Sequence, residues 1–429
     1  MSLFTALSSG ASGLEASSLD LSVVGDNIAN ANTVGYKLGR ADFEDALTQN
    51  IIGGAGDVGL GSQLEAVQTI LTQGSLTSTG NATDLALQGN GFFVVNGDYN
   101  GQDSDYYTRD GQFSIDKDGY LVNQEDLRVQ GYTANASGAV SGIQGDLLVG
   151  TASAQPQPTA NITIKANLDA DATPITAAFD PTDSTTYNFT TSATIYDSLG
   201  AAHQTQVFFQ ETAQGTWDWN AMTDGGGLQG GTAGTLTSIA SGTLTFDSNG
   251  KLETSTQNAG VQFNPLGATA PQALNFDFGD PTSTGGTGLA GVTQFASASA
   301  STFIGQDGYG SGQLSSISVD SQGMINGTFS NGQTRVLGEV AVANFSAADQ
   351  LQSVGGNLYS QSQASGQPVV GAPGAGGRAS IISGSLEQSN VDLTQQFVEM
   401  IAAQRSFEAN SKSISTVDQL LSELIAMKR

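Results

Sequence analysis

The sequence predicts a multidomain α+β protein, in which N- and C-terminal helices pair as an α-helical coiled coil beside two nested, mainly-β domains. Three observations support this fold class. Apolar residues recur every seven positions at both ends of the chain, a spacing typical of helices that wind around one another. Glycine-rich strand patterns fill the middle. The strand patterns weaken in the middle of the chain and then resume. Each domain that encloses an inserted one would therefore be built from two segments, one on either side of the insertion.

The C-terminal helix is predicted within residues 385–429. No Gly or Pro falls between Val391 and Arg429, and the seven-residue series is uninterrupted. A second apolar position begins at Phe397 but becomes polar further along. The apolar stripe is therefore narrow, and such a helix needs a partner because helices gain most of their stability from packing. The series is Leu393, Met400, Phe407, Ile414 and Leu421, and the second position continues as Gln404, Ser411 and Asp418.

The first 30 residues carry a matching series, formed by Leu7, Leu14, Leu21 and Ile28. An amphipathic helix packed on a globular core is the commoner explanation of such a pattern. A matched pair of series at the two termini favours a coiled-coil domain made of residues 1–30 and 385–429. These apolar residues, with Phe397, are the predicted coiled-coil and assembly interface.

The N-terminal series stops at Ala29, and the string that follows it is rich in Asn and Gly, which predicts a helix cap and a turn. Residues 31–75 and 371–384 are predicted to be connectors. Residues 38–75 are expected to be irregular, with a glycine-rich patch at residues 53–56.

The inner β domain is predicted over residues 76–158 and 298–370, and the inserted outer β domain over residues 159–297. One hairpin pattern recurs, in which Asp opens and Gly closes a turn between alternating strands, as in type I turns. It occurs at 113–121, 244–252 and 317–325, with a shorter relative at 194–200.

Composition excludes several function classes. The formal net charge is −27, and most of the acidity lies between the terminal segments, so binding to nucleic acid or anionic lipid is not expected. There is no Cys, hence no disulfide framework. No basic and apolar leader opens the chain, and no run is long enough to insert into a membrane. We therefore expect an intracellular protein or one exported without a cleaved signal.

Catalytic and metal sites find little support. His203 is the only histidine, no G-x-S-x-G elbow is present, and an ordinary surface histidine is expected there. Residues 225–230 and 286–291 match G-x-G-x-x-G without the strand and helix that a nucleotide site needs. Asp116, Asp118, Gly119 and Glu125 fall at EF-hand positions, but Ser114 occupies the first position and no helices flank the loop. We predict no catalytic residue, no cofactor and no metal.

Several long strings resemble the bacterial flagellar rod and hook axial proteins. They are GDNIANANTVGYK at 25–37, TDLALQGNGFFVV at 83–95, YTRDGQFSIDKDGYLV at 107–122 and GSLEQSNVDLTQQFVEMIAAQRSFEANSK at 384–412. Residues 326–345, 355–359 and the turn at 197–200 resemble the hook branch of that family. The family-motif residues are Asn27, Asn30, Asn32, Gly35, Tyr36, Asn390, Gln404, Arg405 and Asn410.

The resemblance implies a structural subunit of the curved helical tube that acts as a universal joint between flagellar rod and filament. It implies export through the flagellar type III export apparatus, a location at the flagellar basal body and hook outside the cell, and terminal helices that line the tube. The implied partners are copies of the chain itself, a hook cap protein, a distal rod protein and hook–filament junction proteins.

Two alternatives remain open. A distal rod subunit would share the terminal strings, although rod subunits lack an insertion such as residues 159–297. A secreted β-rich surface adhesin would explain the acidity, the abundant Gly and the missing Cys, but not the paired terminal series. An enzyme is the third choice.

Overall fold

The computed structural model describes residues 3–46, 49–50, 57–58, 61–135, 137–260 and 262–427. It divides into two compact units. Unit 1 consists of Met1–Ala152, Leu314–Thr328 and Thr334–Arg429, and unit 2 of Ser153–Gln313 with Phe329–Gln333. Unit 2 is thus an insertion in the sequence of unit 1.

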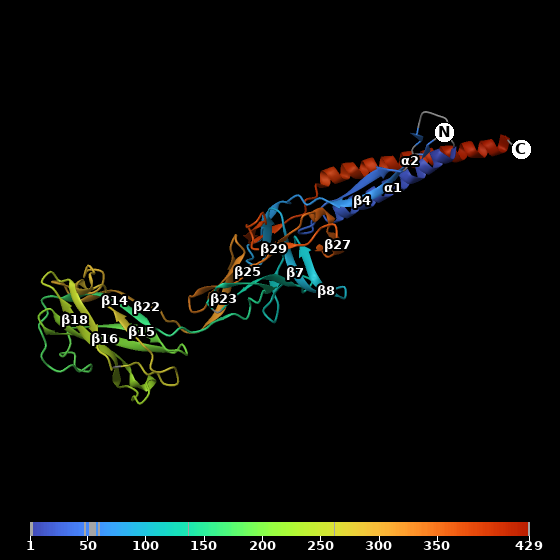
Figure 1. Ribbon diagram of the computed structural model, residues 1–429. Helices are drawn as coiled ribbons and strands as arrows, with labels where there is room; N and C mark the ends of the chain where they lie inside the picture. The colour runs from blue at the N-terminus through green and yellow to red at the C-terminus, as the bar shows by residue number, and fades with distance from the viewer. Residues whose placement is uncertain are drawn as a thin grey trace. The chain divides into compact units, whose positions relative to one another are not determined.

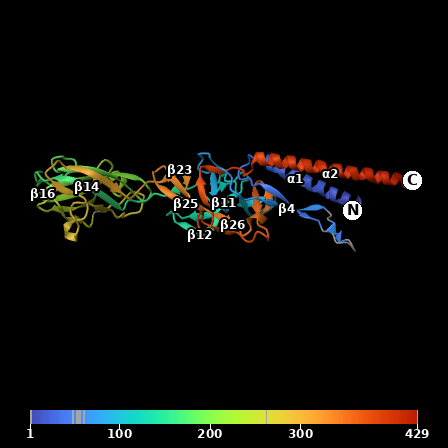
Figure 2. The same cartoon turned by 90° about the horizontal axis from the view of Figure 1, so that it is seen from above.

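The terminal helices are α1 (Leu3–Ala29) and α2 (Leu393–Met427). They lie side by side and antiparallel in both views, with the two chain ends in the same direction (Figures 1 and 2). Helices at the two termini and mainly-β units between them are confirmed. No helix in the described parts of the chain has the length and apolar character needed to cross a membrane.

The segment that follows α1 contains a β-hairpin, so the expectation of an irregular connector over 38–75 is wrong for residues 39–45, 49–50, 57–58 and 62–69. Residues 70–75 are irregular as expected. Strand β1 (Gly39–Asp45) pairs antiparallel with β4 (Ser62–Thr69), and both contact α1. The strand pattern is weak in the sequence because both strands carry many charged or polar residues and are half exposed. The patch at 53–56 lies outside the described residues.

Unit 1 is built on a large antiparallel sheet whose central strands run in the order β24-β25-β11-β7-β8-β28-β27. One of its apolar clusters gathers Phe92, Val94, Tyr107, Phe345 and Tyr359. The other strands of this unit are β2 (Gln49–Asn50), β3 (Asp57–Val58), β5 (Leu76–Ser78), β6 (Leu85–Gln88), β7 (Phe92–Tyr99), β8 (Gln102–Thr108), β9 (Ser114–Ile115), β10 (Leu121–Val122), β11 (Arg128–Ala134), β12 (Val140–Asp146), β23 (Gly312–Val319, which begins in unit 2), β24 (Met324–Phe329), β25 (Thr334–Val340), β26 (Val342–Asn344), β27 (Gln352–Gly355), β28 (Leu358–Ser360), β29 (Val369–Gly371), β30 (Ser380–Ser383) and β31 (Ser385–Glu387), with the 3-10 turn η3 (Ala348–Gln350).

Unit 2 contains a five-stranded antiparallel sheet, β15-β16-β17-β18-β19, and a mixed four-stranded sheet around β14. Strand β14 is parallel to β20 and β21 and antiparallel to β22. Both sheets contribute to one apolar core that includes Trp217 and Trp219. The elements are β13 (Ser153–Ala154), β14 (Asn161–Asp169), β15 (Phe189–Tyr196), β16 (Ala202–Ala213), β17 (Thr216–Asp224), η1 (Gly225–Gly227), β18 (Leu236–Phe246), β19 (Leu252–Gln257), β20 (Asn275–Asp277), η2 (Thr282–Thr284), β21 (Thr293–Phe295) and β22 (Ala300–Gln306).

The repeated hairpin turn is confirmed at all four places. The four aspartates are Asp116, Asp197, Asp247 and Asp320, and in each the Oδ1 atom accepts hydrogen bonds from the backbone N–H groups two and four residues later. The glycine three residues after each aspartate has a positive φ, between 74° and 91°. Only glycine adopts such a conformation without strain, which explains the shared pattern.

Candidate assembly site at the paired chain ends

Two glycines of α1, Gly10 and Gly13, lie in its contact with α2. Gly10, Ser17 and Val24 are buried and lie seven positions apart. A Cβ atom on Gly10 would lie 3.0 Å from Ile414 Cγ1, and one on Gly13 would lie 2.6 Å from Asn410 Nδ2. The missing side chains therefore allow the two helices to approach closely over this stretch.

The second row of the contact face on α2 differs from the expectation. Phe397, Gln404, Ser411 and Asp418 are exposed. The row that faces α1 instead contains Gln396 and Ala403, both buried, followed by Asn410 and Val417, both half-buried. The expectation counted only apolar residues, whereas glycine and serine on α1 accept polar partners such as the Asn410 amide.

The residues of the two seven-residue series are only half-buried or exposed. Leu7, Leu14, Leu21 and Ile28 are half-buried on α1, and Met400, Ile414 and Leu421 are half-buried on α2. Leu393 is 42% exposed and Phe407 is 40% exposed. The series thus keeps part of its apolar surface in contact with solvent.

Further apolar side chains are exposed on the sides of α2 that α1 does not cover. Their exposed fractions run from 40% at Phe407 to 79% at Met427. We call this set the outer apolar surface of α2. It consists of Leu393, Phe397, Val398, Ile401, Phe407, Leu420, Ile425 and Met427.

Asn27 joins the base of α1 to α2 and to β1. Its Nδ2 donates to the Gln396 side-chain oxygen at 2.9 Å and to the Gly39 carbonyl at 2.8 Å. Its Oδ1 accepts from the Gly39 N–H at 2.9 Å and from the Tyr36 hydroxyl at 3.2 Å. Asn27 is 1% exposed, so this amide is buried with both its donors and its acceptor satisfied.

Asn390 plays a similar part just before α2. Its Oδ1 accepts from the Leu38 N–H at 2.8 Å, and its Nδ2 donates to the carbonyl of Ile70 at 2.8 Å. One side chain therefore ties the start of α2 to the segments on both sides of the β1–β4 hairpin.

A buried ionic cluster lies beside these amides. Glu387 Oε1 accepts from Lys37 Nζ at 2.6 Å and from the Gly74 N–H at 2.8 Å, and its Oε2 accepts from Arg109 Nη1 at 3.3 Å. The Lys37 and Glu387 side chains are fully buried, and that of Arg109 is 3% exposed. Burial lowers the pKa of Lys37 and of Arg109, and the Glu387 carboxylate opposes the shift in both.

The family-motif residues fall into four places. Asn27, Gly35, Tyr36 and Asn390 lie at this junction of the chain ends, where Gly35 has a φ of +71° and its N–H donates to the Glu387 carbonyl. Asn30 and Asn32 lie in the turn after α1, and Asn410 lies in the helix contact. Gln404 and Arg405 are exposed on α2.

Sequence reasoning missed Lys37, Arg109, Glu387 and Gln396. Each lies inside one of the strings that carry the family resemblance. Only 12% of the residues in the chain are charged. The charged residues that do occur in these strings were therefore the available sign of a structural role.

The two other candidate sites have structural explanations. His203 is not an ordinary surface residue, since its ring is 11% exposed and Nε2 lies 3.1 Å from Asp197 Oδ2. Hydrogen bonds to His203 and to the turn backbone lower the pKa of Asp197, against the effect of burial. Asp116 opens a hairpin turn, and within the described ranges no group of three or more His, Asp or Glu side chains is placed to hold a metal ion.

Four family models match the chain. They are described as Flagella basal body rod protein (residues 7–37), Flagellar hook protein FlgE/F/G D1 domain (86–178), Flagellar basal body protein FlaE D2 domain (167–309) and Flagellar basal body rod FlgEFG protein C-terminal (382–427).

Curated relatives match over nearly the whole chain. The flagellar hook protein FlgE of Borreliella burgdorferi is 34% identical over 99% of this chain and 100% of that protein. The same protein of Escherichia coli is 33% identical over 99% of this chain and 100% of its own. Among solved structures, the Helicobacter pylori flagellar hook protein FlgE2 matches 73% of this chain and 100% of its own, with 16% identity and a TM-score of 0.47.

Proposed function

Because this chain belongs to the flagellar hook protein family and is a structural subunit of the bacterial flagellar hook, we propose that its copies assemble head-to-tail into a curved helical tube. This tube acts as the universal joint between rod and filament. Contacts of this head-to-tail kind do not close on themselves, so identical subunits extend into a helical polymer.

The outer apolar surface of α2 carries this proposal. One side of α2 packs on α1, while Leu393, Phe397 and Ile401, spaced four residues apart, stay between 42% and 56% exposed. Full burial of such a side chain stabilises a contact by roughly 1.5–3 kcal/mol. A helix of another subunit that covered this surface would therefore gain several such contributions, which an isolated chain cannot supply.

We assign the domains by the same logic. Residues 1–30 and 385–429 form the coiled-coil domain that lines the tube, with the connectors at 31–75 and 371–384. Residues 76–158 and 298–370 form the inner β domain, and residues 159–297 the outer one, nested within it. The antiparallel pairing of α1 and α2 and the insertion of unit 2 into unit 1 support this arrangement.

The proposed interface comprises the two seven-residue series and Phe397. Four of its members on α1 and three on α2 are half-buried, so they have surface left for a neighbour. Exposed Gln404 and Arg405 would face neighbouring subunits or the channel. The proposed partners besides further copies are a hook cap protein, a distal rod protein, hook–filament junction proteins and the type III export apparatus.

A distal rod subunit is the second candidate. The models for residues 7–37 and 382–427 carry rod names, which favours shared terminal helices. The inserted unit 2 and the full-length hook relatives favour the hook. A surface adhesin would not explain the outer apolar surface of α2.

Phe407→Asp tests the proposal. Because Phe407 is 40% exposed, the variant should fold, while a charge on the outer surface should prevent polymerisation. Folding is followed by circular dichroism for the terminal helices and by the fluorescence of Trp217 and Trp219 for unit 2. Polymerisation is followed by sedimentation and electron microscopy. Ser406→Asp is the matched control, since Ser406 is also exposed but lies about 100° around the helix from Phe407. Normal tubes from the Phe407 variant would contradict the assigned interface.

A further inference from the structure

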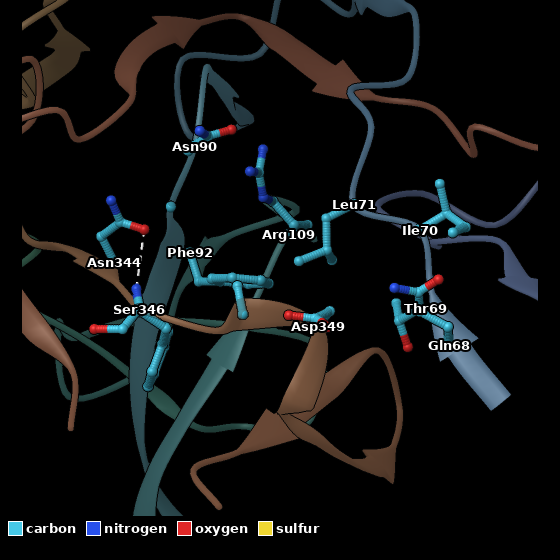
Figure 3. Close-up of a pocket in the computed structure, with 13 residues that line it drawn as sticks. Gln68, Thr69, Ile70, Leu71, Asn90, Phe92, Arg109, Asn344, Ser346 and Asp349 are labelled. Atoms are coloured by element: carbon cyan, nitrogen blue, oxygen red, sulfur yellow. Dashed lines mark hydrogen bonds between the residues drawn. The ribbon is translucent and has the colours of Figure 1, made fainter. Parts of the chain in front are cut away.

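A cavity of about 380 Å³ opens in unit 1 beside the buried ionic cluster. Four segments line it: the end of β4 and the residues after it, the start of β7, Arg109, and the stretch from Asn344 to Asp349 (Figure 3). Its volume suits one side chain and a little backbone, and is too small for a folded element. We call it the Arg109 pocket.

Arg109 brings an unneutralised charge to this pocket. Among the residues that the structure describes, its one carboxylate partner is Glu387, which also pairs with Lys37 at the shorter distance of 2.6 Å. One carboxylate thus serves two buried cations, and the cluster keeps a net charge of +1. A buried charge without a full counter-charge is costly, so an additional anion would stabilise this arrangement.

Arg109 also has a free donor. Its Nη1 donates to Glu387 Oε2 and its Nη2 to the Gly89 carbonyl at 2.9 Å. Its Nε is buried and has no partner in the described part of the chain. The guanidinium carbon lies 5.4 Å from the centre of the Phe92 ring, which fixes the plane of the group. An acceptor placed at this N–H would satisfy the guanidinium donor that the described residues leave without a partner.

The rest of the lining is compatible with a carboxylate. Asn90 lies near the guanidinium, and Asn344 and Ser346 lie on the neighbouring wall (Figure 3). Asn344 Oδ1 accepts from the Phe345 N–H at 2.9 Å. Asp349 lies on the opposite side of the pocket from Arg109 (Figure 3). Its carboxylate repels an incoming anion and so favours placement of that anion beside Arg109.

We propose that the Arg109 pocket receives an acidic side chain from a second copy of this chain during polymerisation. The inference rests on the proposed function, because it requires copies to lie side by side. The chain has 40 acidic and 13 basic residues, so neighbouring copies present exposed carboxylates and repel one another. A buried cationic pocket that binds one of these carboxylates removes part of that repulsion and sets the register between copies.

The first test measures the critical concentration for polymerisation of the full chain. Arg109→Lys keeps the charge of the cluster but removes the Nε donor and the flat guanidinium. It should raise the critical concentration by roughly tenfold, the factor expected for one lost hydrogen bond to a charged group. Asp349→Asn should lower the critical concentration, because it removes the repulsion opposite Arg109. Arg128→Lys is the matched control, since Arg128 is 43% exposed and pairs with Asp146 outside the pocket.

The second test locates the occupant and does not depend on the folding of an Arg109 variant. Since the chain has no cysteine, Ser346→Cys provides a single attachment point for a photoreactive benzophenone on the exposed rim of the pocket. Cross-linking within polymers should join Cys-bearing peptides to an Asp- or Glu-containing peptide of another copy, as identified by mass spectrometry.

The failures of the two proposals are distinguishable. If the wild-type chain forms no polymer, the proposed function itself is wrong. If wild-type polymers form, yet Arg109→Lys and Asp349→Asn assemble as the wild type does and Ser346 cross-links only within its own chain, the docking inference alone is overturned. Retention of added free glutamate by the monomer, without cross-links between copies in the polymer, would also overturn it.

Discussion

Glu387→Gln removes the single carboxylate of the buried ionic cluster and leaves its shape almost unchanged. The carboxylate accepts from Lys37 Nζ at 2.6 Å, from the Gly74 N–H at 2.8 Å and from Arg109 Nη1 at 3.3 Å. A glutamine offers one oxygen and a donating amide in its place. The variant therefore places a donor against one cation and leaves two buried positive charges without a counter-charge.

The expected loss is large. Removal of one partner from a buried ion pair should lower the free energy of unfolding by about 3–5 kcal/mol near neutral pH. The loss should fall with rising pH. Without Glu387, the pKa of Lys37 in the folded state drops further below its unfolded value of about 10.4. Between those two pKa values the unfolded state binds more protons, so the free energy of unfolding of the variant rises with pH.

Urea unfolding, followed by two probes, measures the effect in unit 1 alone. Circular dichroism reports on the terminal helices, while Trp217 and Trp219 report only on unit 2. The helix signal should shift and the tryptophan signal should not. Glu65→Gln, an exposed glutamate on β4, is the matched control. A change below about 1 kcal/mol, or one that does not shrink toward pH 9.5, would refute the role assigned to the cluster.

Two further predictions concern α1 and the β sheet of unit 1. Gly10→Val should force α1 from α2 and destabilise the helix pair by about 1–3 kcal/mol in thermal unfolding, whereas Gly25→Val, with no atom within 4 Å of the added Cβ, should not. Asp110→Asn should raise the free energy of unfolding at pH 7.5 by up to about 3 kcal/mol and change it little near pH 4. Burial raises the pKa of Asp110 from 3.8 to about 6, so the stability present below pH 3.8 is lost as the pH rises through 6. Exposed Asp118→Asn is its control, and equal effects at both pH values would contradict the assignment.

Local patterns predicted much of the fold. The series from Leu393 to Leu421 and from Leu7 to Ile28 predicted two helices at the termini, and the Asp-to-Gly spacing predicted four turns that the structure contains. Both are short-range features, set by the period of a helix and by the geometry of a turn.

Contacts between distant residues were not predictable in the same way. The face of α1 that meets α2 depends on Gly10 and Gly13, which contribute no hydrophobicity and so left no trace in the apolar series. Lys37 and Glu387 pair across 350 positions, and no local pattern records a partner at that distance. The β1–β4 hairpin was missed because its strands alternate poorly and are half exposed.

The separation of Lys37 from Glu387 also fixes an order of events for a chain that emerges from one end. In such a chain the N-terminal residues of unit 1 leave first. Asn27 and Lys37 therefore lack their hydrogen-bond partners Gln396 and Glu387 until the C-terminal part of the chain has followed. Unit 2 meets no such delay, because nearly all of it is one continuous stretch, Ser153–Gln313. Closing so long a loop is entropically slow compared with local pairing. The inserted unit can therefore mature first, and the arrival of the C-terminal helix becomes the last step that completes the subunit.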